Sequence, residues 1–240
     1  MSNILSSFNM QNIRGLSIII PSLNEVDNLI KLIDYIKNIH LEKYEIIVVE
    51  GGNDTQIRKN FKKYREVKIF NNDKGRAKQL NKGSKMAKYN WLYFLHSDCI
   101  PPKNFKEIIY KSMIDKNQAS CFKLRFKPTN FFLSLSARAT KYNNIFCRGG
   151  DQSLLIHKNL FFLCGGFDEN YNVCEDINLI NKIYMKGKFK IMDAYIITDS
   201  RRFSKNGTLK LLIHFGVIHL LHYLKFSPKT LYRYYNLFIK

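Results

Sequence analysis

The residues of this chain best suited to chemistry are polar side chains that directly follow short apolar runs. Asp98 comes after the apolar run 91–95 (WLYFL) and the pair His96-Ser97, and a proline turn follows it. Such a run is typical of a buried strand. A carboxylate at the tip of a strand suits a hard cation such as Mg²⁺ or Mn²⁺ that bridges a diphosphate. Turns also favour Asp for local reasons, so Asp98 alone does not establish a metal site.

Two further groups stand at predicted helix starts. Gly75 and Arg76 open a basic helix over 75–88, and a helix N-terminus beside an arginine can bind phosphate. Glu175 and Asp176 open a later helix, where a carboxylate facing a cleft can act as a general base. Acidic residues at this position also complement the helix dipole. Adjacent helical residues point in different directions, so at most one of the pair is expected to face a given reacting atom.

The elements that must position these groups alternate along the first half of the chain. Apolar runs at 16–20, 44–50, 67–70 and 90–96 predict strands, and amphipathic segments between them predict helices. This alternation indicates parallel strands joined by crossovers. In open α/β sheets, ligands bind beyond the carboxyl ends of the strands. The segments PSLNE, EGGND and HSD stand at three such ends, and Asn24 within the first is expected to cap the following helix.

The second half of the chain is less regular. A strand is expected over 120–127, a turn followed by a strand within 147–157, and a strand over 189–200. Helices are expected over 131–143 and within 165–187 after a loop. No repeat, low-complexity tract or linker is evident. We therefore expect one α/β domain over residues 16–206, preceded by an extension over 1–15 and followed by a basic amphipathic helix and tail over 207–240.

The composition limits the classes of binding partner that are expected. Lys and Arg number 39 against 19 Asp and Glu, a net charge of +20. This excess indicates nucleic acid, nucleotide phosphates or an acidic membrane as partner, or is a compositional habit of the chain. No nucleic-acid-binding motif is present, so no specific nucleic acid is expected. The five cysteines form no C-x-x-C, which argues against a disulfide framework or zinc knuckle and indicates a reducing compartment.

The N-terminus has no signal-peptide pattern, and no apolar run is long enough to span a membrane. A cytoplasmic location is expected. The segment 209–224 is amphipathic, with Leu209, Ile213, Val217, Leu220 and Leu224 on one face. Such a helix can lie in the interface of an anionic membrane, here the inner face of the cell membrane, or it can dock on the body of the protein.

The ordered set of motifs resembles a known family. The segments SIIIPSLNE, IIVVEGG, GRAKQLNKG, FLHSD, GGDQ, GGFDE and ED appear in this order between about residues 16 and 226. The set is similar to the family 2 glycosyltransferases of GT-A fold, and to a small bacterial branch with H-x-D, G-D-Q and a final R-R-aromatic element. The implied fold is α/β and Rossmann-like, with a mainly parallel sheet flanked by helices and a C-terminal amphipathic helix.

The resemblance implies an activity. A sugar would pass from a nucleotide-diphosphate donor to an acceptor hydroxyl with inversion, as in a hexosyltransferase, assisted by a divalent cation, Mn²⁺ or Mg²⁺. UDP-linked donors are the first expectation by family frequency. The acceptor is undefined, and only the basic tail points to a lipid-linked one.

The resemblance also assigns roles to individual residues. Asp98 would hold the metal. Asp176 would be the general base, with Glu175 as the second candidate, and Arg202 would help to neutralise the leaving diphosphate. The residues that would line the site for the nucleotide sugar are Pro21, Asn24, Glu25, Glu50, Gly51, Gly52, Arg76, Gln79, Asn81, His96, Asp151, Gln152, Gly165 and Gly166.

Three positions depart from the family pattern. His96 stands where many relatives have the first Asp of D-x-D, Glu50 stands in place of Asp, and Phe203 replaces a tryptophan. With His96 there, the metal would depend on one protein carboxylate. The alternatives are a nucleotidyltransferase, an inactive member of the family, or a basic module that binds nucleic acid or membrane. Nucleotidyl transfer would call for further metal-binding carboxylates near Asp98.

Overall fold

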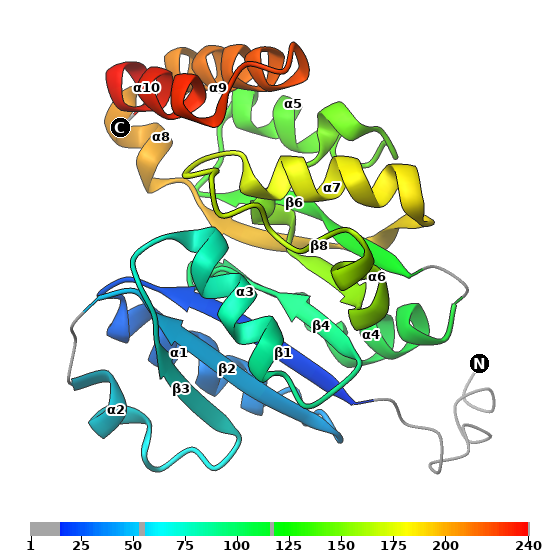
Figure 1. Ribbon diagram of the computed structural model, residues 1–240. Coiled ribbons are helices and arrows are strands. Elements are labelled where there is room, and N and C mark those ends of the chain that lie inside the picture. The colour runs from blue at the N-terminus through cyan, green and yellow to red at the C-terminus, as the bar shows by residue number, and fades with distance from the viewer. Residues whose placement is uncertain (1–14, 53–55, 116–117, 240) are drawn as a thin grey trace.

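A computed structural model describes residues 15–52, 56–115 and 118–239 (Figure 1). The predicted N-terminal extension therefore lies outside the described residues, apart from Gly15. Eight strands form one sheet in the order β3-β2-β1-β4-β7-β6-β8-β5. The strands are β1 (Leu16–Ser22), β2 (Tyr44–Glu50), β3 (Val67–Asn71), β4 (Trp91–Phe94), β5 (Cys99–Ile100), β6 (Ala119–Lys127), β7 (Leu154–His157) and β8 (Phe189–Asp199).

Helices cover both faces of this sheet (Figure 1). They are α1 (Val26–Lys37), α2 (Gln56–Phe61), α3 (Arg76–Met86), α4 (Phe105–Ile114), α5 (Phe131–Ala139), α6 (Lys158–Leu163), α7 (Glu175–Lys186), α8 (Arg201–Asn206), α9 (Thr208–Tyr223) and α10 (Pro228–Phe238). The predicted alternation of strands and helices in the first half is confirmed.

The half of the sheet formed by β1, β2, β3 and β4 is parallel throughout. β1 pairs with β2 and with β4, and β2 pairs with β3, all in parallel. The carboxyl ends of these strands therefore meet at one edge, which places PSLNE, EGGND and HSD side by side. The other half is mixed: β7 is antiparallel to both β4 and β6, while β6 and β8 are parallel.

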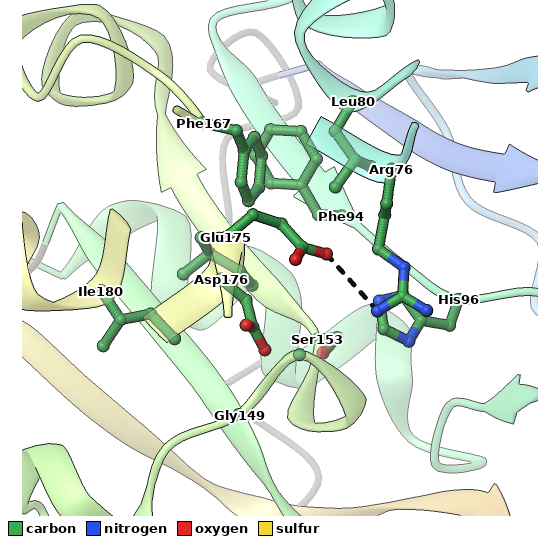
Figure 2. A pocket seen from close by; sticks show the side chains of 12 residues that line it. Arg76, Leu80, Phe94, His96, Gly149, Ser153, Phe167, Glu175, Asp176 and Ile180 are labelled. Carbon is green, nitrogen blue, oxygen red and sulfur yellow. Dashed lines mark hydrogen bonds and ion pairs between the residues drawn. The ribbon is translucent and has the colours of Figure 1, made fainter. Parts of the chain in front are cut away.

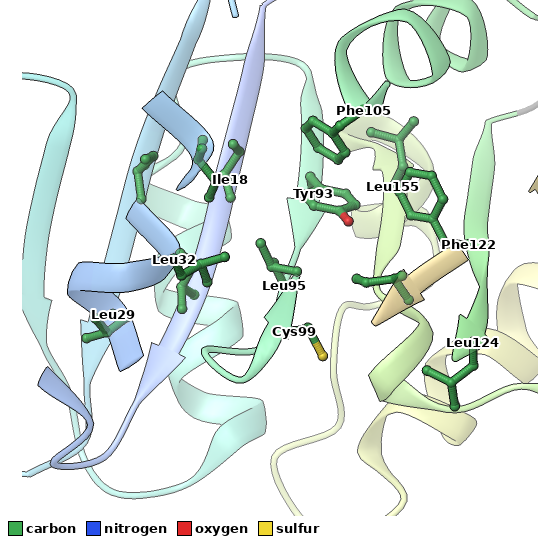
Figure 3. Close-up of a cluster of buried hydrophobic side chains, with 14 of the residues drawn as sticks. Ile18, Leu29, Leu32, Tyr93, Leu95, Cys99, Phe105, Phe122, Leu124 and Leu155 are labelled. Carbon is green, nitrogen blue, oxygen red and sulfur yellow. The ribbon is translucent and has the colours of Figure 1, made fainter. Parts of the chain in front are cut away.

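The strands are apolar on both faces because helices cover both faces. Ile18 and Ile20 point into one hydrophobic cluster and Ile19 into the other, and all three are fully buried. Figure 3 shows the first cluster, where Leu29 and Leu32 of α1 lie close to Ile18. Alternation along a strand sends successive side chains to opposite faces, so a continuous apolar run is what a doubly covered strand requires.

The predicted capping of α1 by Asn24 is wrong. The helix begins at Val26 with Glu25 in the N-cap position, and no side chain caps it. Asn24 takes a left-handed backbone conformation, φ 57°, and its backbone N–H donates to Glu50 Oε1 at 3.2 Å. A long-range contact with the end of β2 fixes this turn instead of a local cap.

The C-terminal segment forms three helices that dock on the body of the protein. Leu211 and Ile218 of α9 and Leu231 of α10 are buried within the same hydrophobic cluster as the central strands. The predicted stripe of 209–224 faces the other way, because four of its five members are at least half exposed. No described helix is long and apolar enough to cross a membrane. The domain boundary at residue 207 stays a prediction.

Candidate functional site

A pocket lies where the strand ends of the parallel half meet the start of α7. Figure 2 shows its charged and polar lining, in which the side chains of Glu175 and Asp176 lie on one side and those of Arg76 and His96 on the other. Its apolar lining is Leu80, Phe94, Leu154, Phe167 and Ile180. The pocket thus gathers motifs that are up to 100 residues apart in the sequence.

Two helix N-termini face each other across this pocket. Arg76 is the first residue of α3 and Glu175 the first of α7, and Arg76 Nη1 lies 3.4 Å from Glu175 Oε1. Glu175 is almost fully buried, whereas about half of the Arg76 side chain is exposed. Burial raises the pKa of Glu175, an effect that Arg76 opposes and Asp176 reinforces. Glu175 therefore holds Arg76 at the N-terminal end of α3.

Asp176 projects toward the turn of the GGDQ motif. One of its oxygens accepts the backbone N–H of Ile177. A Cβ atom added at Gly150 would lie 2.7 Å from Asp176 Oδ2 and 3.0 Å from His96 Cε1. Only glycine at position 150 therefore leaves room for both side chains. The turn keeps the predicted general base, the predicted metal region and the GGDQ segment in mutual contact.

A second group of acidic side chains surrounds Asp98. Asp151 Oδ1 lies 3.2 Å from His96 Nδ1, and Ser97 Oγ donates to Glu25. Burial raises the pKa of Asp98, and the negative charges of Asp151 and Glu25 add to the rise while His96 opposes it. Negative charge is therefore concentrated at this strand end.

The pKa of Asp151 moves in the opposite direction. Burial acts to raise it, but the hydrogen bond to His96 and the electrostatic effect of that ring and of two nearby guanidinium groups lower it below its ordinary value. These two groups belong to Arg76 and Arg202. Asp151 is thus paired with His96 and lies within the electrostatic influence of both arginines.

The donor atoms near Asp98 fit a hard divalent cation. One donor atom from each of His96, Asp98 and Cys99 lies within 4.8 Å of the other two. Burial raises the pKa of the Cys99 thiol well above its ordinary value, and its Sγ lies 3.5 Å from Thr198 Oγ1. The Cys99 side chain is buried, and the donors of this group that suit a hard cation are the Asp98 carboxylate and the His96 imidazole. Carboxylate oxygens suit Mg²⁺ and Mn²⁺, and an imidazole is compatible with Mn²⁺.

Glu50 is fully buried and braces the loops around the predicted nucleotide pocket. Its carboxylate accepts hydrogen bonds from Ser22 Oγ at 2.6 Å and from the Gly52 backbone N–H at 2.8 Å. A Cβ at Gly52 would lie 2.7 Å from Asn24 Oδ1, so this glycine lets the two loops approach. Both carboxylate oxygens are engaged with protein donors. Contact between Glu50 and a nucleotide base stays a prediction.

Two predicted nucleotide-facing amides of α3 also hold the framework. Gln79 donates to the backbone carbonyls of Ser22 and Val49, at 2.7 and 2.8 Å, which ties the ends of β1 and β2 together. Asn81 donates to the Phe167 carbonyl at 2.8 Å and accepts from the Phe167 N–H at 3.0 Å. Through these bonds α3 fixes the Gly165–Gly166 turn, whose glycines have positive φ.

Gln152 points into the protein. Its Oε1 accepts from the buried Arg148 at 2.6 Å, and its Nε2 donates to the Cys147 carbonyl at 2.6 Å. Arg148 in turn donates to the Thr140 and Tyr142 carbonyls. Within the GGDQ segment, the Asp side chain faces the site and the Gln side chain anchors the turn.

Arg202 is held by the C-terminal helix. Its Nη2 donates to Tyr235 Oη at 2.7 Å and to the Ile239 carbonyl at 3.1 Å, and its guanidinium lies over the Tyr235 ring at 5.0 Å. Sequence analysis missed Tyr235 because 33 residues separate it from Arg202 and no local pattern connects them. It also missed the anchoring role of Arg148, for which the only signal is its place two residues before Gly150.

Pro21 and Asn24 lie at the end of β1 and in the turn after it, and Gly51 packs against the Gln79 side chain. All predicted site residues therefore lie on the loops around one end of the sheet or directly behind them. Their individual roles stay predictions.

Comparison with known proteins identifies similar sequences and folds. Residues 17–167, more than half of the chain, match the family described as Glycosyl transferase family 2. No curated protein matches the chain. The fold resembles a mannosyltransferase from Pyrobaculum calidifontis in complex with GDP-Man and Mn²⁺, with 17% identity and a TM-score of 0.62 over 77% of this chain and 56% of that chain.

A second similar structure is S. aureus TarS 1-349 in complex with UDP, with 18% identity and a TM-score of 0.63 over 77% of this chain and 60% of that chain. This chain thus spans less than two thirds of the length of either. At these identities the likeness establishes the fold alone, and that fold is the predicted GT-A fold.

Proposed function

This chain belongs to glycosyl transferase family 2, and from that premise we propose that it transfers a sugar from a nucleoside-diphosphate sugar to an acceptor hydroxyl with inversion. The observation that carries the proposal is the pocket lined by Arg76, His96 and Asp176, with the Asp98 and Asp151 carboxylates beside His96. Cations for a diphosphate lie on one side and a carboxylate able to accept a proton lies within reach. Two solved structures of similar fold hold GDP-Man with Mn²⁺ and UDP, which supports a nucleotide-linked donor.

The diphosphate would lie at the start of α3. The free N–H groups of a helix N-terminus attract anions, and Arg76 is positioned there by Glu175. Arg202 lies close enough to influence Asp151 across the pocket. As the bond to the sugar breaks, negative charge develops on the leaving diphosphate, and fixed cations stabilise it most when they are held in place beforehand.

The carboxylate of Asp98, with His96 and Asp151, would hold the divalent cation. When bound, such a cation neutralises charge on the leaving diphosphate as a Lewis acid. The excess of negative charge around Asp98 is what a cation would relieve. In this arrangement Asp151, in addition to Asp98, would supply an oxygen ligand in place of the missing first Asp of D-x-D.

Asp176 would remove the proton from the acceptor hydroxyl. Inversion requires one displacement, with the hydroxyl attacking the anomeric carbon from the face opposite the diphosphate. A carboxylate on that face takes the proton as the new bond forms. Glu175 is paired with Arg76 and nearly fully buried, so its expected contribution is to position Arg76.

Nucleotidyl transfer remains the second candidate because of one observation. Asp151 and Glu25 lie near enough to Asp98 to raise its pKa, so further carboxylates are present at the predicted metal position. The two reactions give different products, since glycosyl transfer releases a nucleoside diphosphate and nucleotidyl transfer releases pyrophosphate.

The test begins with thermal unfolding in the presence of UDP, GDP, ADP or CDP, each with and without Mn²⁺. A ligand that binds only the folded protein raises the unfolding midpoint by mass action. At a concentration one hundred times its dissociation constant, it increases the free energy of unfolding by about 2.7 kcal/mol. We expect one diphosphate to stabilise the wild type only with Mn²⁺, and Asp98→Asn to lose the effect. The sugar nucleotides of that base are then assayed for release of the diphosphate, and the nucleoside triphosphate of that base, supplied with a sugar phosphate, is assayed for release of pyrophosphate. If no nucleotide stabilises a well-folded protein, or if pyrophosphate is released, the proposed function is wrong.

A further inference from the structure

Acidic residues are absent from two long stretches of the chain. Residues 116–150 contain seven Lys and Arg and no Asp or Glu, and residues 200–240 contain eight Lys and Arg and no Asp or Glu. All 19 acidic residues lie elsewhere. The positive charge of the protein is therefore unevenly distributed, and the two stretches are those that form α5 and the three C-terminal helices.

The fold brings these two stretches together. Asn130 Nδ2, at the start of α5, donates to Thr208 Oγ1 at the start of α9 with a distance of 2.8 Å. The ring of Phe146, beyond the end of α5, lies 5.2 Å from the ring of Tyr223 at the end of α9. The two helices therefore run alongside each other, at the top of the molecule in Figure 1.

Both helices expose large apolar side chains on the side opposite their buried side. In α5, Leu133 and Ala137 are buried while Phe131 is 74% exposed. In α9, Leu211 and Ile218 are buried while the opposite side is exposed. We call the exposed set the α5–α9 face, and it consists of Phe131, Phe132, Leu135, Leu209, Ile213, Leu220 and Leu224.

Basic side chains accompany this face. Arg138 of α5 and Lys210 of α9 are exposed, and Lys225 follows the end of α9, also exposed. The acidic residue that most closely precedes α9 in the sequence is Asp199. It is paired with Arg201, with Asp199 Oδ2 2.7 Å from Arg201 Nε. No carboxylate of residues 200–239 is available to repel an anionic partner.

We propose that the α5–α9 face binds the surface of an anionic lipid bilayer. Apolar side chains can enter the boundary between headgroups and acyl chains, while Lys and Arg remain at the anionic headgroups. Both features are needed for this partner. A nucleic acid would match the positive charge but would leave the exposed Phe and Leu side chains without a suitable environment. The binding needs no nucleotide sugar, so it stands or falls separately from the proposed glycosyl transfer.

The test is sedimentation of the full chain with vesicles. We expect binding to vesicles of phosphatidylcholine with phosphatidylglycerol, little binding to phosphatidylcholine alone, and weaker binding as salt is raised. The apolar variant changes Leu209, Ile213, Leu220 and Leu224 to Gln. We expect its partition coefficient to fall by at least about ten-fold, since burial of a single Leu contributes more than a factor of ten. The control, Leu163→Gln with Met185→Gln, removes two apolar side chains from α6 and α7 that are more exposed than those of the variant, and it should change binding by less than about two-fold.

A second pair of variants tests the charge. Lys210→Gln with Lys225→Gln should lower binding by about five-fold per charge, the effect expected for a basic residue near an anionic surface. Lys59→Gln with Lys62→Gln removes two exposed lysines around α2, on the other side of the molecule, and should have little effect. Unfolding midpoints of all variants, measured in parallel, verify that each is folded.

Three results would overturn the proposal. The first is a wild type that does not bind anionic vesicles, or that binds neutral ones equally well. The second is a folded apolar variant that binds as well as the wild type. The third is a wild-type molar mass in solution corresponding to a dimer that the apolar variant abolishes, because the face would then be covered by a second copy of the chain.

Discussion

Replacement of Gly150 by Ala tests the geometry on which the proposed chemistry depends. Gly150 does not have a left-handed backbone, so Ala is compatible with its conformation. The added methyl group would lie 2.7 Å from Asp176 Oδ2 and 3.0 Å from His96 Cε1. Ordinary contacts at this type of atom begin at 3.4 Å. The carboxylate of Asp176 must therefore move by about 0.7 Å, and the His96 ring by a smaller distance.

The size of the effect follows from this displacement. Misplacing a reacting group by about 1 Å can cost a factor of about 100 in rate, so we expect the turnover number to fall by about ten-fold to a hundred-fold. The stability loss should be smaller, because Oδ2 is the far end of a side chain that can rotate. Mild overpacking costs about 1 kcal/mol, which corresponds to about 2–4 °C in the midpoint for a chain of this length.

The assay measures nucleoside diphosphate released from the nucleotide sugar that the binding experiment identifies. Gly149→Ala is the matched control, because a Cβ at Gly149 meets nothing within 4 Å and the backbone there is extended. It adds a methyl group to the wall of the pocket without displacing Asp176 or His96, so the loss of rate should be clearly smaller than for Gly150→Ala. Equal losses in the two variants would contradict the geometric argument.

A double variant isolates the part of the effect that acts through Asp176. Asp176→Asn keeps the size of the side chain and removes the base. If Gly150→Ala acts by displacing this carboxylate, adding it to Asp176→Asn should lower the remaining rate by less than about two-fold, since coupled sites are not additive. Full additivity of the two losses would mean that the glycine acts elsewhere.

Three further predictions follow, two on supports of the site and one on a buried carboxylate at the opposite end of the sheet. Tyr235→Phe removes a hydrogen bond to Arg202. It should raise KM for the donor by about five-fold and lower the free energy of unfolding by about 1–2 kcal/mol. Tyr232→Phe, at an exposed position, is the control in the same kinetic and unfolding measurements. Asn81→Ala removes buried bonds between α3 and the loop before α7, so denaturant titration should show a loss of about 2–3 kcal/mol; a loss below about 0.5 kcal/mol would refute the bracing role. In Glu45, burial raises the pKa, but hydrogen bonds from Lys68, Ser17 and Lys88 outweigh it and lower the pKa below 4.5. The resulting stability is present above pH 4.5 and is lost as pH falls through the lowered pKa. The destabilisation by Glu45→Gln should therefore shrink in acid. A difference in unfolding free energy between the two proteins that stays constant from pH 7 into the acid range would contradict this.

Patterns of neighbouring residues were sufficient to predict the framework. The runs at 16–20 and 44–50 are apolar except at Ser17, Glu45 and Glu50, as strands covered on both faces require. The helices starting at Arg76 and Glu175 are predicted from residues within one or two turns. Parallel pairing followed from the alternation of strands and helices. The place of the site then followed, because parallel strands bring their carboxyl ends to one edge.

Local patterns could not predict which side chains of the motifs face the pocket and which bond to the backbone of other elements. Gln79, Asn81 and Gln152 stand in the same motifs as Arg76 and Asp151, yet their amides bond to backbone carbonyls of other elements. Whether a polar side chain points into a pocket or behind it depends on partners distant in the chain. The failed cap at Asn24 has the same cause, since its turn is fixed by Glu50, 26 residues away.

The C-terminal helices show this division most clearly. The sequence predicted an amphipathic helix over 209–224, and that helix exists. Its sequence is apolar on two sides, so local periodicity could not decide which side docks. Packing against the core selected Leu211 and Ile218, which left the predicted stripe exposed, and it brought Tyr235 to Arg202. Secondary structure follows from neighbours along the chain, whereas the choice between two apolar sides follows only from the shape of the surface on which the helix docks.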